Sequence, residues 1–76
     1  MSELPQATGQ ETINALTRLG FHVARVKGSH HIMKRAGHRH VITVPAHGSK
    51  PLKRGTLRSI LRSAGFTVAE FCEALK

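Results

Sequence analysis

Six histidines are the only ordinary acid–base groups in the central part of this 76-residue chain. The chain contains no Asp, and no Glu lies between Glu11 and Glu70. A serine-type triad needs a carboxylate to orient its histidine, and a two-metal nuclease needs carboxylates to hold Mg²⁺. The sequence therefore disfavours both chemistries. The remaining chemistry is proton transfer by histidine, whose reference pKa of ~6.5 allows it to accept and donate protons near neutral pH.

A metal site is one alternative use of these histidines. His38 and His40 are separated by one residue, so on a strand their side chains would lie on the same face. His22 or His47 could complete a set of three ligands. However, the chain has neither a pair of Cys residues nor a His-x₃-His spacing on a helix. We therefore expect no metal and no cofactor.

The charge of the chain indicates a polyanionic partner. The formal net charge is +8, and eleven of the 12 Lys and Arg residues lie between Glu11 and Glu70. Nucleic acid is the commonest partner of such a surface. RNA supplies its own nucleophile, the 2′-hydroxyl, so its cleavage needs only a proton acceptor, a proton donor and cations at the phosphate. A basic surface that is merely solvated is the alternative interpretation.

The tetrapeptide Gly28-Ser29-His30-His31 is the first candidate site. Gly28 and Ser29 favour a turn at which a phosphate can approach free backbone N–H groups. His30 and His31 would face opposite sides of a following strand, so only one of them can reach a substrate. The residues alone leave two interpretations, catalysis by His30 or a simple turn followed by two solvated histidines.

A second basic cluster begins at Pro45-Ala46-His47 and continues into an expected helix. Lys50 and Lys53 precede this helix, and three arginines recur along it every four residues, at Arg54, Arg58 and Arg62. Such a row can follow a phosphate backbone, and no acidic residue alternates with the arginines. The alternative is an ordinary solvated helix face.

These candidate residues need a scaffold, and the sequence predicts helix, three strands, helix and short helix. Capping boxes are expected at Thr8 with Glu11 and at Thr67 with Glu70. Helix-ending glycines are expected at Gly20 and Gly65. The expected strands cover residues 21–26, 31–35 and 40–44, and residues 36–39 are the expected connection between the last two. The expected apolar faces are Ile13, Leu16 and Leu19 on the first helix; Leu57, Ile60, Leu61 and Ala64 on the second; and Val68, Phe71, Cys72 and Leu75 on the short third.

This order predicts an α+β fold, a double-stranded-RNA-binding-domain-like αβββα sandwich. Its three-stranded antiparallel sheet would carry helices on one face, with a short extra helix at the C-terminus. We expect one domain over residues 8–76 and a disordered tail over residues 1–7. No apolar run reaches the ~20 residues needed to cross a bilayer. A single cysteine, Cys72, is typical of a reducing compartment, so we expect a cytoplasmic protein without membrane contact.

Four short motifs, in this order, resemble the HicA toxin family of bacterial and archaeal HicA–HicB toxin–antitoxin pairs. They are Leu19-Gly20-Phe21, Val26-Lys27-Gly28-Ser29-His30-His31, Val44-Pro45-Ala46-His47, and the stretch from Gly55-Thr56-Leu57 to Ala64-Gly65-Phe66. The resemblance covers roughly residues 11–75. It implies the αβββα fold, the catalytic role of His30, and a HicB antitoxin that covers the active face.

The resulting interpretation is a metal-independent endoribonuclease, an mRNA interferase of a type II toxin–antitoxin system that arrests translation and growth in a stress response. His30 would be its general base or acid. A non-catalytic RNA-binding module of the same fold is the alternative. We expect the toxin alone to be monomeric and to form a higher-order complex with its antitoxin. The expected RNA contacts are Lys27, Gly28, Ser29, His47, Lys50, Lys53, Arg54, Arg58 and Arg62.

Overall fold

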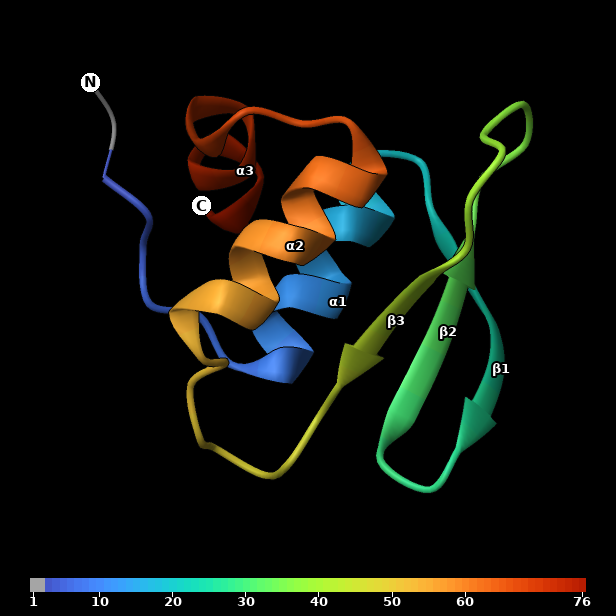
Figure 1. Ribbon diagram of the computed structural model, residues 1–76, viewed down its shortest axis with the longest axis horizontal. Helices are drawn as coiled ribbons and strands as arrows, with labels where there is room; N and C mark the ends of the chain where they lie inside the picture. Colours follow the sequence, from blue (N-terminus) through green and yellow to red (C-terminus); the bar gives the residue numbers. More distant parts are fainter. Residues whose placement is uncertain (1–2) are drawn as a thin grey trace.

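The computed structural model describes residues 3–76 and confirms the predicted order of elements (Figure 1). The helices lie on one side of the sheet, as predicted, so the fold is α+β. The elements are α1 (Gly9–Arg18), β1 (His22–Lys27), β2 (His30–Lys34), β3 (Ile42–Pro45), α2 (Arg54–Ala64) and α3 (Val68–Leu75).

Both predicted capping boxes are present. The Thr8 hydroxyl accepts a hydrogen bond from the Glu11 amide at 3.0 Å, and the Glu11 carboxylate accepts one from the Thr8 amide at 2.8 Å. Thr67 and Glu70 repeat the arrangement at the start of α3, with distances of 3.1 and 2.8 Å. Each box satisfies two of the amides that a helix start leaves without partners, which fixes where α1 and α3 begin.

The predicted helix-ending glycines are also confirmed. Gly65 follows α2 with a φ of 82°, in the left-handed region that favours glycine, and its amide donates to the Leu61 carbonyl at 2.9 Å. Gly20 follows α1 with a φ of 100°. The chain can therefore turn directly from α1 into β1 and from α2 toward α3.

The sheet is antiparallel with the order β1-β2-β3, as predicted. Its strands are shifted from the predicted ones, since β2 starts at His30 rather than His31 and β3 starts at Ile42 rather than His40. The connection between them is longer than the predicted one, and His38 within it is held against the helices. Its Nε2 lies 2.9 Å from the Ser63 carbonyl oxygen at the end of α2, and its ring packs edge-on against Phe21.

The core lies between the sheet and the first two helices. Alternate residues of β2 and β3 point into it, and the first cluster of buried residues is Ile13, Leu16, Phe21, Met33, Ile42, Val44, Ile60 and Ala64. A second cluster joins the helices to one another and consists of Ala7, Ala15, Leu57, Leu61, Phe71 and Ala74. The short helix α3 packs against α1 rather than against the sheet. On α3, Phe71 and Ala74 are buried, while Val68, Cys72 and Leu75 are half-buried.

The segment before α1 contributes to this packing. Ala7 is 1% exposed, and its carbonyl accepts a hydrogen bond from the Leu52 amide at 2.8 Å. Leu4 packs against the second cluster. Met1 and Ser2 lie outside the described residues, so the expected tail over residues 1–7 and its boundary at residue 8 stay a prediction. Over residues 3–76, no helix is both long enough and apolar enough to cross a bilayer.

Candidate active site

His30 is the first residue of the central strand, at the end of the sheet where β1 turns into β2. Its Cα partners are Lys27 on β1 and Pro45 on β3. Residues directly opposite one another share a face of a sheet, and alternate residues of a strand share a face. Because Met33 points into the core, His30 must point to the face that no helix covers. The His30 side chain is exposed there.

The turn before His30 is formed as the sequence predicts. Gly28 has a φ of 60°, and a Cβ placed on it would have no atom within 4 Å. The space beside the Gly28 backbone is therefore open, as a close approach by a phosphate requires. Lys27 ends β1 beside this turn and is exposed.

His31 lies on the other face of the sheet. Its Cα partners are Val26 and Val44, and its Nδ1 is 3.3 Å from the carbonyl oxygen of Ser29. It is half-buried. The structure therefore separates the two adjacent histidines as predicted, and His30 is the one on the uncovered face.

The loop after β3 brings His47 to the same turn. The Ala46 amide donates to the Ser29 carbonyl oxygen at 2.8 Å, which extends the pairing of β2 and β3 by one bond. The Ser29 hydroxyl then lies 3.3 Å from His47 Nε2. Residues 18 positions apart in the sequence thus meet beside His30, and no pattern in the sequence indicates this contact.

An open groove of about 500 Å³ continues from His47 toward the start of α2. Such a volume is within the range of small-ligand sites. Helix α2 begins here without a side-chain cap at Lys53 and without an acidic residue in its first turn, so its first amides are free to donate to an anion. The residues that line the groove are Pro45, His47, Lys50, Pro51, Leu52, Lys53 and Thr56.

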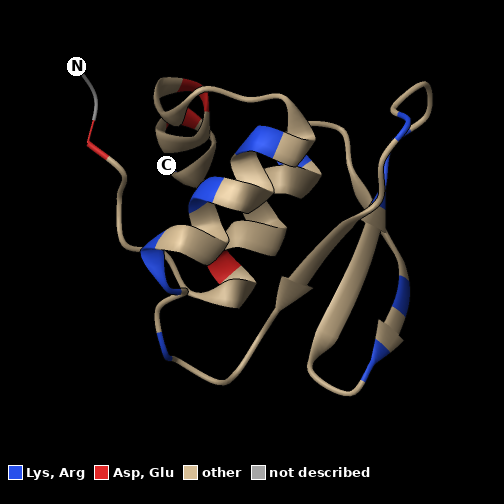
Figure 2. Cartoon of the chain, in the orientation of Figure 1, with Lys and Arg blue, Asp and Glu red and all other residues tan. Residues whose placement is uncertain are grey.

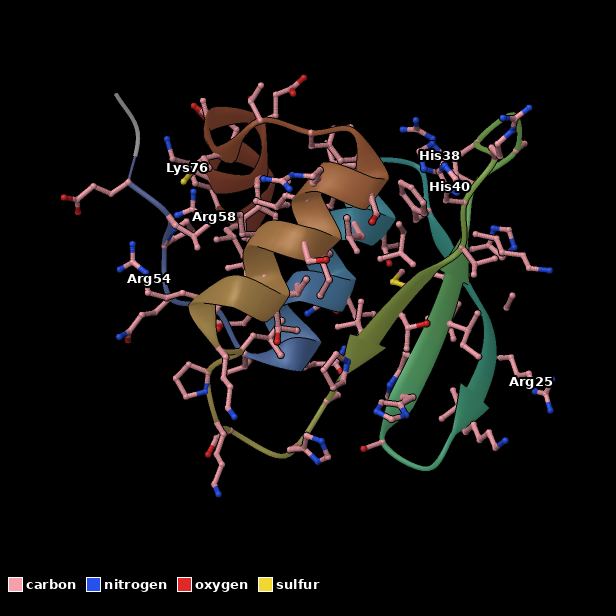
Figure 3. All side chains as sticks on the ribbon, in the orientation of Figure 1. Arg25, His38, His40, Arg54, Arg58 and Lys76 are labelled. Atoms are coloured by element: carbon pink, nitrogen blue, oxygen red, sulfur yellow. The ribbon has the colours of Figure 1, made fainter. Side chains whose placement is uncertain are left out.

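The arginine row lies away from this groove. In an α-helix each residue is rotated by 100°, which puts Arg54, Arg58 and Arg62 on one side of α2. Thr56, Ser59 and Ser63 lie on the side that faces the groove and β3. Figure 3 shows Arg54 and Arg58 extending from α2 away from the sheet. The structure therefore divides the predicted RNA contacts into a group beside His30 and a separate row.

Cations and acids are also segregated over the whole molecule. Figure 2 shows Lys and Arg on β1, α2 and the loops, whereas the Glu residues lie at the start of α1, on α3 and in the N-terminal segment. Within residues 3–76, the one side-chain ion pair joins Lys76 to Glu73 at 3.3 Å, at the end of α3. Lys27, Lys50 and Lys53 are exposed and make no ion pair there. Their charge is available to an anionic ligand.

Two further histidines, His38 and His40, lie at the opposite end of the sheet from His30 and make packing contacts there (Figure 3). Their rings are 6.2 Å apart, and the His38 ring is 5.3 Å from that of Phe21. Arg35 covers the Phe21 ring at 4.9 Å and donates a hydrogen bond to the Leu19 carbonyl at 3.2 Å. These contacts hold the long β2–β3 loop to the core. Among residues 3–76, no three His, Cys, Asp or Glu side chains are placed to share a metal ion.

The fold and this site together define a class, a small basic α+β domain with an exposed histidine at the end of its sheet and cations around it. Residues 9–66 match the family model described as the HicA toxin of bacterial toxin–antitoxin. The chain therefore belongs to the HicA toxin family, as the sequence motifs predicted. The match runs from the start of α1 to Phe66 and ends before α3. HicA toxins are known as mRNA interferases that pair with HicB antitoxins. A comparison with curated proteins finds no significant match.

Proposed function

We propose that this protein is a ribonuclease toxin that cleaves mRNA without a metal, with His30 as a general base or acid, and thereby arrests translation and growth. The observation that supports this most is the position of His30. It is exposed on the uncovered face of the sheet, directly between Lys27 and Pro45. A cationic groove begins at Pro45. A phosphate held by these cations would lie within reach of an imidazole.

The proposed reaction uses the nucleophile that RNA contains. The 2′-oxygen attacks the neighbouring phosphorus, the bond from phosphorus to the 5′-oxygen breaks, and a 2′,3′-cyclic phosphate forms. One proton leaves the 2′-hydroxyl and one reaches the departing 5′-oxygen. Lys27, Lys50 and Lys53 would stabilise the charge that develops on the phosphate oxygens. General acid–base help of this kind contributes about 10²–10⁴-fold to a rate.

The competing function is RNA binding without cleavage. Single-strand binding modules stack bases on exposed aromatic side chains. Here Phe21 and Phe71 are buried, and Phe66 packs edge-on against Phe21 at 6.2 Å. The uncovered face of the sheet instead presents His30, Lys27 and Lys34, since these alternate with the buried positions. This favours chemistry at phosphate over base stacking.

The test is cleavage of a defined RNA by the purified toxin in EDTA, with His30→Ala as the variant. We expect a loss of about 10²-fold or more, with RNA binding and thermal stability unchanged because the His30 side chain is exposed. His40→Ala is the matched control, since His40 is also exposed but lies at the other end of the sheet. Cleavage by His30→Ala at the rate of His40→Ala would disprove the assignment. RNA binding without any cleavage by the unmodified protein would favour the non-catalytic module.

A further inference from the structure

Proton transfer on both sides of a phosphate needs two groups, and the other five histidines differ in whether they can assist His30. His22 pairs with Lys34 at the far end of β1, roughly 16 Å along the strand from Lys27. His38 and His40 are held at that same end of the sheet. His31 faces the helix layer. Only His47 lies on the loop that is bonded to the turn immediately before His30.

Three contacts fix the position of His47. Pro45 lies opposite His30 in the sheet, and the Ala46 amide donates to the Ser29 carbonyl at 2.8 Å. His47 Nε2 is 3.3 Å from the Ser29 hydroxyl. Ser29 is thus adjacent to His30 in the chain and in contact with His47 in space. Ser29 therefore links His30, its neighbour in the chain, to the His47 ring, which lines the groove.

A catalytic imidazole must gain and lose a proton in each turnover, and the Ser29 hydroxyl is a suitable hydrogen-bond partner for the His47 imidazole in such a role. A serine hydroxyl can accept a hydrogen bond from a protonated ring nitrogen or donate one to an unprotonated nitrogen. A carboxylate can only accept, and it favours the protonated imidazole. The carbonyl that faces His31 Nδ1 also can only accept, which fixes one tautomer. The Ser29 hydroxyl can pair with His47 Nε2 whether or not that nitrogen carries a proton, whereas the carbonyl can pair with His31 Nδ1 only while Nδ1 is protonated.

We propose that His47 is a second catalytic residue and that Ser29 positions it. One of the two histidines, His30 or His47, accepts the proton of the 2′-hydroxyl while the other donates a proton to the departing 5′-oxygen. Bond formation at phosphorus and bond cleavage are thereby each matched by one proton transfer, and the two histidines end in exchanged protonation states. Water exchange restores them. This inference rests on the proposed ribonuclease activity and adds the residue that completes it.

The first experiment compares His47→Ala with His40→Ala on an RNA oligonucleotide in EDTA. We expect kcat for His47→Ala to fall about 10²-fold or more, since one proton transfer is lost. A residue that only binds RNA would change KM and leave kcat near its original value. Ser29→Ala should lower kcat less and alter the pH profile of kcat, because it disturbs only the orientation of His47. A kcat for His47→Ala within threefold of the His40→Ala value would overturn the proposal.

The second experiment assigns the two roles with an RNA analogue that carries sulfur in place of the bridging 5′-oxygen. A thiolate departs without being protonated, so the variant that lacks the proton donor should recover, while the variant that lacks the proton acceptor should not. Recovery of one of His30→Ala and His47→Ala, but not of the other, supports two divided roles. Recovery of both variants or of neither overturns the proposal.

The pair of variants also separates this inference from the proposed function. If His30→Ala is inactive and His47→Ala is active, the ribonuclease stands and only the role of His47 is wrong. If both variants keep full activity on RNA, the proposed function of this site fails as well.

Discussion

Gly9 lies where α1 begins, and the backbone of Pro45 and Ala46 passes directly over it. A Cβ at residue 9 would overlap the Pro45 carbonyl oxygen and the Cα of Ala46. The absence of a side chain therefore lets the loop that carries His47 rest against the start of α1. Nothing in the local sequence indicates this role, because a glycine in a first helical turn is otherwise unremarkable.

Gly9→Ala should destabilise the protein, because the loop after β3 must move to admit the methyl group. Overpacking of this kind typically costs about 1–3 kcal/mol, which for a domain of this size corresponds to roughly 4–8 °C in Tm per kcal/mol. Thermal unfolding by circular dichroism is the measurement. Cleavage of RNA should fall as well, since His47 moves with the loop.

Gly55→Ala is the matched control for this prediction. Gly55 is also in the first turn of a helix, but a Cβ there would have no atom within 4 Å. This substitution should raise stability by up to about 1 kcal/mol through helix propensity alone. Equal effects of the two substitutions would show that the contact with Pro45 and Ala46 is not important.

At the scale of single elements, α2 presents three different sides. Leu57, Ile60 and Leu61 are buried and attach the helix to the core. Thr56 lines the groove beside His47. The row of Arg54, Arg58 and Arg62 lies on the remaining side and is exposed, and Figure 3 shows Arg54 and Arg58 turned away from the sheet. A single strand of RNA that passes His30 would meet Lys50 and Lys53 before it met this row.

Lys50 and Lys53 should therefore affect both the binding and the cleavage of RNA, whereas the arginine row should affect binding alone. Lys50→Gln with Lys53→Gln should lower kcat/KM and reduce the salt dependence of RNA binding by roughly 1.4 in log–log slope, at about 0.7 per phosphate contact on a single strand. Arg58→Gln with Arg62→Gln should weaken binding and reduce the slope while kcat at saturating RNA stays unchanged. An unaltered slope in the arginine variant would mean that the row is only a solvated helix face.

At the scale of the whole molecule, the acids are placed where they leave the cationic surfaces free. Glu11 and Glu70 serve the capping boxes, and Glu73 pairs with Lys76. The uncovered sheet face should therefore attract RNA and, by the same charge, an acidic protein. An antitoxin of the HicB kind could inhibit simply by occupying that face in place of the phosphates.

We therefore expect an acidic HicB-like antitoxin to bind over His30, with Lys27 and Lys50 at the edge of the contact. Opposite charge should raise the association rate above the ~10⁵–10⁶ M⁻¹s⁻¹ of neutral pairs at low salt, whereas rim charges add little to affinity. Hydrogen exchange or cross-linking of the complex, together with an RNA cleavage assay, tests this. Protection confined to α1 and α3, with His30 still accessible to RNA, would indicate inhibition through conformation instead.

The sequence predicted most of the fold because the deciding signals are local. Thr8 with Glu11, Thr67 with Glu70, and the helix-ending Gly20 and Gly65 act within one helical turn, so their spacing is sufficient. The start of β3 was predicted two residues too early. In the loop before β3, His38 contacts Ser63 and Phe21, which are distant in the sequence, and no local pattern indicates these contacts.

Composition and local spacing by themselves determined that this protein is a basic α+β domain with His30 after a tight turn, and the resemblance of four motifs predicted the HicA family. They could do so because charge is a sum over residues, and because caps, turns and strand alternation depend on near neighbours. Only the tertiary structure placed His47 against Ser29, separated the arginine row from the groove, and showed why residue 9 is glycine. Each of these depends on the pairing of β3 with β2 and the packing of α1 and α2, contacts between segments that no local pattern connects.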